Sequence, residues 1–254
     1  MTRKSIILLL VAIISIVSQA FADDTLHFVG VQNIIPFAYE EEGVKKGIDY
    51  DVFMEISKRM GFTAKIELLP WKRIWESLKK GSIDGTFEIY FNKKREEFII
   101  YAKNPMRYSV INVFVNKGSE FEFRNVNDLF GKKVGKQSAF FISPEFEQAV
   151  KSKKIVLDEA RDVDRNLKKL ISKRIDCIVS NPQIVRFYMK KLGLQDKIVK
   201  LPVALVPEKK LHLALSKKGK NIKDKLQFIE EINKIIKEIH LDGTFQKISD
   251  KYLN

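Results

Sequence analysis

The sequence is poor in the residues that build metal centres and disulfide frameworks. Its 254 residues include one cysteine, Cys177, and three histidines, His27, His212 and His240, which lie far apart along the chain. A single cysteine cannot form an internal disulfide, and isolated histidines lack the spacing of a zinc or iron–sulfur site. We therefore expect no bound metal and no cofactor. Cys177 lies in an apolar segment and is interpreted as a buried structural thiol.

The motifs of several enzyme classes are also absent. The chain has no Gly-x-Ser-x-Gly nucleophile elbow, no Walker phosphate loop and no His-Glu-x-x-His zinc motif. The segment Gly131-Lys132-Lys133-Val134-Gly135 contains two glycines but lacks the dinucleotide-binding fingerprint. With no activated nucleophile or acid–base pair visible, we expect that the chain is not an enzyme.

Long apolar runs are absent except at the start of the chain. Arg3 and Lys4 precede an almost unbroken apolar run from Ile6 to Val17, and Ala20-Phe21-Ala22 has the small-x-small form of a cleavage site. This pattern is typical of a secretory signal peptide, here residues 1–22. An uncleaved membrane anchor is the alternative, but the run is short for a span. We expect a mature protein that is soluble, monomeric and exported to a bacterial periplasm.

Basic residues outnumber acidic ones, 46 to 32, which gives a formal net charge of +14. The basic residues are spread along the chain beside acids, and no cluster interleaves arginine with aromatic residues as a nucleic-acid groove does. We interpret the charge as a solvated surface and expect no nucleic-acid partner. A weak attraction to an anionic membrane surface stays open.

The mature part of the chain alternates strand-like and helix-like segments. Residues 49–60 place Val52, Phe53, Ile56 and Met60 on one helical face, and a long helix with isoleucines from Ile222 to Ile239 is expected near the C-terminus. Shorter β-branched segments separate these helices. The alternation predicts an α/β protein with largely parallel sheets. Strands are expected over residues 26–31, 64–69, 83–89, 108–115, 132–136, 155–157, 175–179 and 211–215.

Several segments occur in an order that resembles a known family. They are Gly47-Ile48-Asp49-Tyr50-Asp51-Val52-Phe53, the segment Gly81-Ser82-Ile83-Asp84-Gly85 with Arg95 eleven residues after Asp84, and the C-terminal Leu241-Asp242-Gly243-Thr244-Phe245. Their order and spacing are similar to those of the extracytoplasmic solute-binding proteins of family 3, the polar amino-acid receptors of ABC importers. The resemblance covers essentially the whole mature chain.

The resemblance implies a type II periplasmic binding protein fold, in which two α/β lobes are joined by two hinge strands. It places the first lobe at residues 23–110, the second at 111–203, and a return to the first lobe at 204–254. Such lobes close on a small polar ligand and bury most of it.

The resemblance also implies ligand-binding residues in the first lobe. Arg95 matches the arginine that binds the ligand carboxylate in this family. An arginine suits that role because its planar guanidinium offers two parallel donors. Trp71 matches an aromatic residue that packs on the ligand. Phe87, Glu88 and Tyr90 stand where the family often has small hydroxyl residues, so the wall is bulkier here and carries an acid. The alternatives are a surface charge for Arg95 and core or strand packing for the aromatic residues.

In the second lobe, Ser138 and Ala139 match a turn whose backbone N–H groups meet the ligand carboxylate. Asn181 stands where the family has an ammonium-binding aspartate. A ligand ammonium would therefore lack a counter-charge at Asn181, unless Glu88 supplies one.

These residues predict a receptor for a small polar, carboxylate-bearing, amino-acid-like solute, which docks on the membrane permease of an ABC importer. Two alternatives stay open. One is a dehydratase of the prephenate or arogenate type, in which Glu88 would act as acid or base. The other is a protein that presents its bound ligand to a sensor. Product formation from prephenate or arogenate would identify the first, and a ligand-dependent pull-down from membranes would identify the second.

Overall fold

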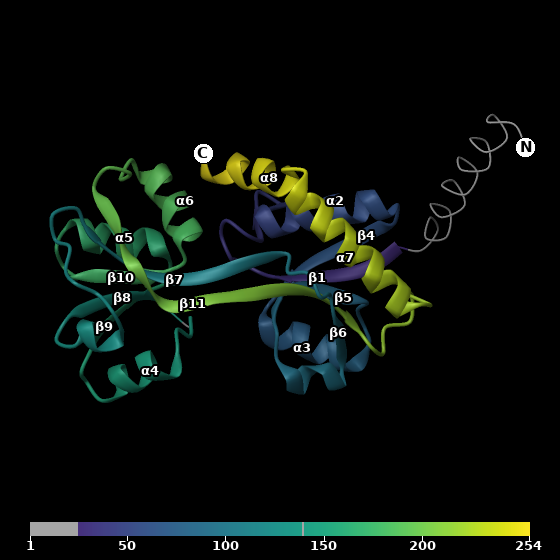
Figure 1. Cartoon of the computed structure of the whole chain (residues 1–254), viewed down its shortest axis with the longest axis horizontal. Helices are drawn as coiled ribbons and strands as arrows, with labels where there is room; N and C mark the ends of the chain where they lie inside the picture. Colours follow the sequence, from purple (N-terminus) through teal and green to yellow (C-terminus); the bar gives the residue numbers. More distant parts are fainter. Residues whose placement is uncertain (1–24, 139) are drawn as a thin grey trace, which may run out of the picture. The chain divides into compact units, whose positions relative to one another are not determined.

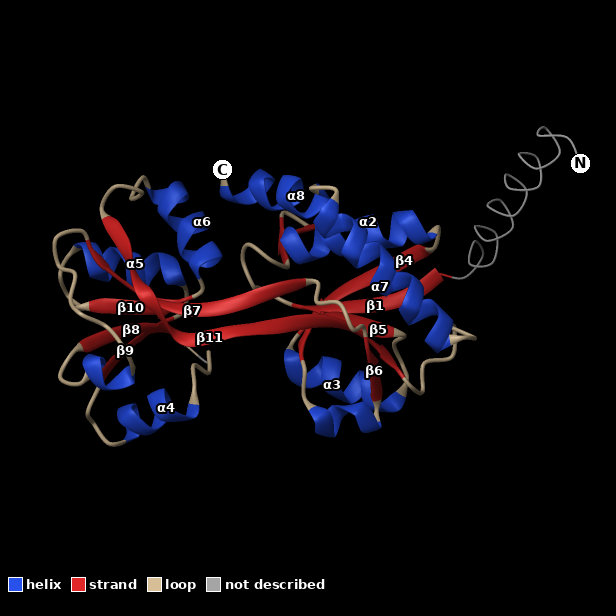
Figure 2. Cartoon of the chain, viewed as in Figure 1, coloured by secondary structure: helices blue, strands red, loops and turns tan. Residues whose placement is uncertain are grey.

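The computed structural model describes residues 25–138 and 140–254 and divides them into two units of mixed α/β structure (Figures 1 and 2). Unit 1 holds the described residues up to Arg107 together with Lys210–Asp250, and unit 2 holds Tyr108–Lys209 and Lys251–Asn254. The chain passes between the units within two strands, β7 (Arg107–Asn116) and β11 (Ile198–Ser216), and again near the end of helix α8 (Thr244–Leu253). The predicted α/β class is confirmed. The predicted signal peptide lies outside the described residues.

Unit 1 is a sheet with helices on both faces. Its strands are β1 (Thr25–Val31), β4 (Thr63–Leu69), β5 (Gly85–Tyr90), β6 (Ile99–Tyr101) and the end of β11, with a separate hairpin of β2 (Tyr39–Glu41) and β3 (Val44–Lys46). The sheet order is β4–β1–β5–β11, with β1 parallel to β4 and β5, and β11 antiparallel to β5 and β6. The helices are α2 (Ile48–Met60), α3 (Trp71–Lys80), the short η1 (Lys93–Glu97) and α7 (Lys225–Leu241), and α8 (Thr244–Leu253) follows.

Helices α2 and α7 cover one face of this sheet, and α3 covers the other (Figure 1). As predicted, α2 buries Val52, Phe53, Ile56 and Met60. It ends where Gly61 adopts a left-handed conformation with φ 77°, which a glycine reaches without steric cost.

The core under α2 is built from phenylalanine rings. The ring of Phe53 lies 4.7 Å from Phe28 and 4.9 Å from Phe87, and Phe62 lies 5.5 Å from Phe228. All five rings are buried. Their close packing places β5, which carries three of the predicted site residues, firmly on this core.

Asp84, which follows the Gly81-Ser82-Ile83 segment, is a buried connector rather than a ligand-facing acid. Its carboxylate accepts hydrogen bonds from the backbone N–H of His27 at 2.9 Å and from the Asn221 side chain at 2.9 Å. The aspartate therefore joins β1 to the segment that leads into α7, and it fixes the start of β5.

Unit 2 repeats the plan of a sheet with helices on it. Its sheet order is β7–β10–β8–β9, with β8 parallel to β9 and β10, and β10 antiparallel to β7. The strands are β8 (Lys133–Gln137), β9 (Val156–Ala160) and β10 (Cys177–Ser180), and the helices are η2 (Val126–Leu129), α4 (Pro144–Lys151), α5 (Val163–Ile171) and α6 (Pro182–Leu192). Cys177 is a free, buried thiol as expected, and burial raises its pKa to about 12.

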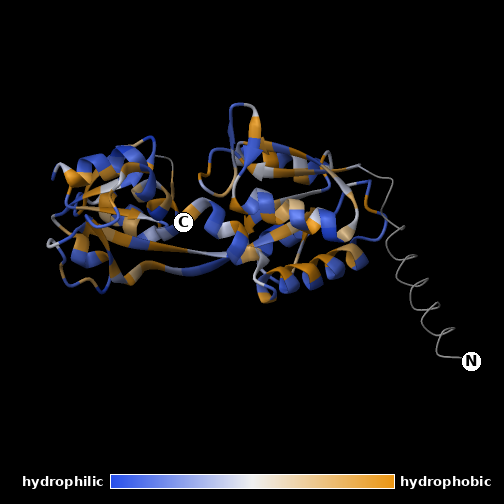
Figure 3. Cartoon of the chain, turned by 90° about the horizontal axis from the view of Figure 1, so that it is seen from above, coloured by the Kyte–Doolittle hydropathy of each residue, from blue (hydrophilic) through white to orange (hydrophobic). Residues whose placement is uncertain are grey.

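The helices carry their hydrophobic residues in stripes (Figure 3). Helix α7 buries Phe228, Ile232, Ile236 and Ile239, which lie on one face. It begins at Lys225, after the predicted Ile222, because Asp224 caps it by accepting from the backbone N–H of Gln227. In the part of the chain that the structure describes, no helix is both long and apolar enough to cross a membrane.

Candidate functional site

Unit 1 has a surface pocket of about 360 Å³ between α3 and the segment around η1. Helix α3 lines it with Trp71, Trp75 and Lys79, which are spaced by four residues and so share one face. The opposite wall is Asn92, Lys94, Arg95, Glu97 and Phe98. The lining holds three cationic side chains and one acid, so the pocket favours a negatively charged group.

Arg95 and Trp71, predicted from separate segments, meet in this pocket. The guanidinium carbon of Arg95 lies 4.8 Å from the ring centre of Trp71 and 5.6 Å from that of Trp75. Lys79 also lies beside two aromatic rings of the pocket, with Nζ 5.0 Å from the ring centre of Trp75 and 5.6 Å from that of Phe98. Cations held on indole faces keep a fixed position while their N–H groups stay available.

Tyr90 supports Arg95 through its backbone. The carbonyl of Tyr90 accepts from Arg95 Nη1 at 3.2 Å and from the Tyr101 hydroxyl at 3.3 Å. The Tyr90 side chain is exposed. The structure therefore relates Tyr90 to the pocket through its carbonyl contact with Arg95, and a ligand contact of Tyr90 stays a prediction.

Phe87 lies in the core. Its ring is fully buried and stacks on Phe53 with an interplanar angle of 17°. A Cβ atom at Gly30 would come within 2.5 Å of the Phe87 ring, so the glycine makes room for it. We assign Phe87 a packing role and leave it out of the site proposed below.

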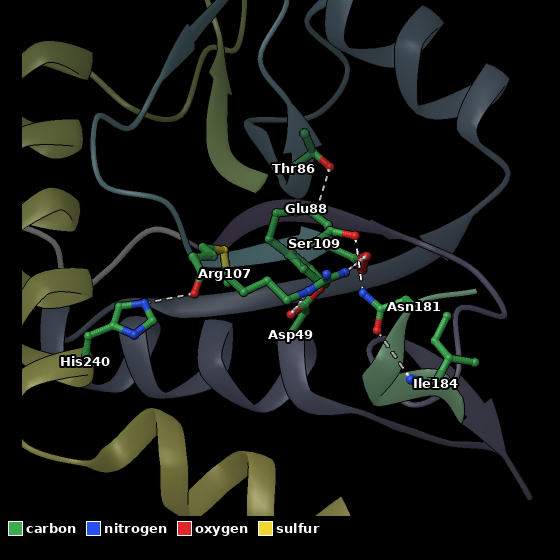
Figure 4. Close-up of polar contacts among 10 residues, drawn as sticks. Asp49, Thr86, Glu88, Arg107, Ser109, Asn181, Ile184 and His240 are labelled. Carbon is green, nitrogen blue, oxygen red and sulfur yellow. Dashed lines mark hydrogen bonds and ion pairs between the residues drawn. The ribbon is translucent and has the colours of Figure 1, made fainter. Parts of the chain in front are cut away.

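Glu88 belongs to a buried ionic cluster with Asp49 from α2 and Arg107 from β7 (Figure 4). Arg107 Nε donates to both Asp49 oxygens, at 2.8 and 2.7 Å, and Arg107 Nη2 lies 3.9 Å from Glu88 Oε2. The ring of Phe37 packs on the guanidinium, 3.5 Å from its carbon. Asp49, Glu88 and Arg107 are 1%, 7% and 5% exposed. Across the described ranges, no three His, Cys, Asp or Glu side chains gather as a metal site would need.

Arg107 lies beside both acids of this cluster, and the pKa values of Glu88 and Asp49 are shifted. Burial, followed by the charge of Asp49, raises the pKa of Glu88 well above its usual value, and Arg107 opposes the rise. Burial also raises the pKa of Asp49, although Arg107 lowers it. Two close carboxyl groups titrate as a pair. The pKa of both acids shifts upward, and the shift is larger for Glu88, which lies farther from the Arg107 guanidinium.

Sequence reasoning named Glu88 but missed Asp49 and Arg107 as its partners. Asp49 stands in the Gly47–Phe53 segment, which carried the family resemblance, and Arg107 opens a strand that is otherwise rich in β-branched residues. An arginine at the start of an apolar strand was the available signal, because a buried charge needs a partner.

In unit 2, Ser138 follows β8 and its side chain is exposed. Its backbone N–H already donates to the Ala160 carbonyl at 2.8 Å. Ala139, the second predicted residue of this turn, lies outside the described residues. The buried Lys136 holds the turn by donating to the Phe140 carbonyl at 2.8 Å, with Glu159 at 3.2 Å from its ammonium.

Asn181 is the N-cap of α6 (Figure 4). Its Oδ1 accepts from the backbone N–H groups of Gln183 at 2.8 Å and Ile184 at 3.4 Å. Its Nδ2 donates to Ser109 Oγ at 3.3 Å and to the Val110 carbonyl at 3.4 Å. A carboxylate cannot donate, so the amide satisfies two sets of partners that an aspartate could not. Its role as a ligand contact stays a prediction.

Replacing Asn181 with alanine should lower the free energy of unfolding by about 1 kcal/mol, because α6 loses its cap. Urea denaturation of the wild type and the variant measures the difference. Asn127→Ala, at an exposed position within η2, is the matched control and should change little. Equal midpoints for the wild type and Asn181→Ala would contradict the capping role.

The chain is similar to known solute-binding proteins over nearly all of its described residues. The model of the bacterial extracellular solute-binding proteins, family 3, matches residues 26–254. The probable amino-acid-binding protein YxeM of Bacillus subtilis is 26% identical over 233 residues, which cover 91% of this chain and 85% of YxeM. The L-cystine-binding protein TcyJ of Escherichia coli K12 is 24% identical, with 85% of this chain and 78% of TcyJ covered.

Among solved structures, the second substrate-binding domain of GlnP from Lactococcus lactis, in an open conformation, matches with a TM-score of 0.70 and 19% identity. The match covers 91% of this chain and 96% of that domain. This likeness establishes the fold as the two-lobed periplasmic binding protein fold of type II, as the sequence predicted.

Proposed function

The chain belongs to the bacterial extracellular solute-binding proteins of family 3, and we propose that it binds a small, carboxylate-bearing, amino-acid-like solute and delivers it to an ABC importer. Membership in a solute-binding family agrees with the expectation that the chain is not an enzyme. Two of its relatives, a probable amino-acid-binding protein and an L-cystine-binding protein, support the ligand class. We further propose that residues 1–22 are a signal peptide that directs the protein to the periplasm, where it acts as a monomer.

The observation that carries this proposal is the meeting of Arg95 with Trp71 and Trp75 in one pocket of unit 1. The guanidinium has five N–H donors, and the Tyr90 carbonyl accepts from one of its terminal nitrogens. A carboxylate can accept two parallel bonds from such a group. The indole rings beside it offer apolar area to the rest of the ligand.

Trp71→Ala should weaken ligand binding about two- to thirty-fold. The indole holds Arg95 by a cation–π contact of about 0.5–2 kcal/mol, and its loss lets the guanidinium move. Isothermal titration calorimetry measures the affinity, and the thermal midpoint should stay close to that of the wild type because Trp71 is half-buried at the surface. Unchanged affinity would place Trp71 away from the ligand.

A thermal-shift screen tests the proposed function directly. The probes are L-arginine, L-glutamine, L-glutamate, L-cystine and succinate, added to the mature chain. A ligand at a hundred times its dissociation constant adds about 2.7 kcal/mol. For a chain of this size that corresponds to a rise of about 5 to 11 °C in the midpoint. If no probe raises the midpoint, the ligand class is wrong.

A further inference from the structure

We propose that the Glu88 carboxyl is a second ligand-binding group of unit 1, which carries a proton in the free protein and exchanges it for a cationic nitrogen of the ligand. This inference rests on the proposed function, because it requires an amine-bearing solute. It assigns the cation-binding role to unit 1 and not to Asn181.

The geometry of the cluster leaves Glu88 without a full counter-charge. Arg107 Nε is committed to Asp49, with both oxygens within 2.8 Å. Arg107 Nη2 is 3.9 Å from Glu88 Oε2, which is beyond a hydrogen bond. Glu88 Oε1 is buried and accepts no hydrogen bond from a donor among the described residues, while the Glu88 carboxyl is in hydrogen-bond contact with Asp49. A buried carboxylate that accepts no hydrogen bond is costly, whereas a protonated carboxyl can donate to Asp49 until a ligand donor replaces that contact.

The backbone at Glu88 is strained in a way that points to function. Glu88 has φ 72°, in the left-handed region that non-glycine residues rarely adopt, within strand β5. The strand is held on both sides of it, because Phe87 and Ile89 are buried and Thr86 Oγ1 donates to the Val29 carbonyl at 2.8 Å. Strain of this kind persists where the surroundings enforce it and clusters at binding sites. Here the strain lies at the acid of the cluster that has the longer contact with Arg107, 3.9 Å against 2.7 Å for Asp49.

The other charged groups around β5 do not compete for Glu88. Helix α2 contributes Asp49 and strand β7 contributes Arg107, and these two groups set the charge of the cluster. On the neighbouring strands, His27 of β1 lies 3.0 Å from Glu67. His212 of β11 has Nδ1 2.9 Å from the Ala102 carbonyl. A single proton on the two acids therefore balances the cluster.

The exchange keeps the cluster neutral. In the free protein Asp49 is ionised, Arg107 is cationic and Glu88 carries a proton, so the charges cancel. When a ligand ammonium donates to Glu88, the carboxyl loses its proton to solvent, and the ammonium charge offsets the new carboxylate. Binding therefore releases one proton at a pH below the pKa of Glu88. In that range, affinity should fall by up to tenfold for each unit that the pH drops.

Calorimetry in two buffers of different ionisation enthalpy, phosphate and Tris, counts the protons released on binding. We use L-arginine, L-glutamine and L-cystine as amine-bearing probes and succinate as a probe without an amine. The wild type should release close to one proton with an amine-bearing probe and none with succinate. Glu88→Gln should release none and bind the amine-bearing probes at least tenfold more weakly, with succinate little changed. Glu120→Gln, at an exposed position of unit 2, is the matched control.

A titration of the free protein tests proton storage without any ligand. The pKa of Glu88 is raised above its value of about 4.3 in the unfolded chain. The stability gained from holding the proton is thus complete below about pH 4.3 and is lost as the pH rises through the folded pKa. The thermal midpoint of the wild type should therefore fall relative to that of Glu88→Gln between pH 4.5 and 8.

The two proposals fail separately. A midpoint difference that stays constant with pH overturns the proton storage, whatever binds. An amine-bearing probe that binds wild type and Glu88→Gln equally, without proton release, overturns the role of Glu88 and leaves the receptor function standing. If no probe binds the wild type, the proposed function fails instead, and the free-protein titration still decides whether Glu88 stores a proton.

Discussion

Replacing Arg95 with alanine should reduce affinity for a carboxylate-bearing ligand by roughly thirty-fold to a few thousand-fold. Removing one partner of a desolvated charge pair costs about 2–5 kcal/mol. The fold should survive, because Arg95 is only half-buried and its protein contacts are the Tyr90 carbonyl and the faces of two indoles. Isothermal titration calorimetry of the wild type and variant, with the best probe from the thermal-shift screen, measures the loss.

Arg165→Ala is the matched control, because this arginine lies on α5 in unit 2 with its side chain 62% exposed. It should bind the probe as the wild type does. Binding by Arg95→Ala within threefold of the wild type would show that Arg95 is a surface charge, which was the alternative reading of its lysine- and glutamate-rich segment.

Replacing Arg107 with methionine should lower the free energy of unfolding by about 3–5 kcal/mol. The change leaves Asp49 and Glu88 buried together without the Arg107 cation. Removing one partner of a buried ion pair destabilises a protein by about 3–5 kcal/mol, because the remaining charge is left uncompensated. The loss should grow as the pH rises from 5 to 8. Without Arg107 both acids hold raised pKa values in the folded state, so the stability they contribute disappears as the pH passes through those values. Urea denaturation at several pH values measures both effects.

Two further variants make this result interpretable. Lys103→Met removes an exposed partner of Glu230 and should cost less than about 1 kcal/mol. The double variant Asp49→Asn with Arg107→Met should recover part of the loss, because one buried acid is gone. If the free energy of unfolding of Arg107→Met stays within about 1 kcal/mol of the wild-type value at every pH, Arg107 does not neutralise the cluster.

Much of the fold could be predicted because its signals are local. The apolar spacing of α2, with Gly61 as its end, needs only neighbouring residues. Strand β11 is different. It runs for 19 residues from Ile198 to Ser216 in the structure, whereas the sequence predicts a strand only over residues 211–215. Pro202, Pro207 and the charged residues after it interrupt the apolar pattern where the chain passes between the units.

The candidate site was harder to predict because it depends on distant residues. Asp49 and Arg107 are 58 positions apart, so no spacing rule connects them. Trp75 and Lys79 share a helical face with Trp71, which the sequence shows, but their contact with Arg95 depends on how η1 packs on α3. Phe87 was expected in a ligand-facing wall because it stands where the family often has small hydroxyl residues. The left-handed backbone at Glu88 breaks the normal alternation of side chains along a strand, and a glutamate gives no sign of it.

Intrinsic tryptophan fluorescence tests the central claim most directly, because both tryptophans of the chain, Trp71 and Trp75, line the unit 1 pocket. The mature protein is titrated with L-arginine, L-glutamine and L-cystine, and the same samples are measured by calorimetry. A carboxylate that binds beside Arg95 should change the emission in a saturable way, with the calorimetric dissociation constant, and Arg95→Ala should abolish the change at the same concentrations. Calorimetric binding with unaltered emission, and with equal affinity in Arg95→Ala, would contradict the claim that this pocket binds the solute.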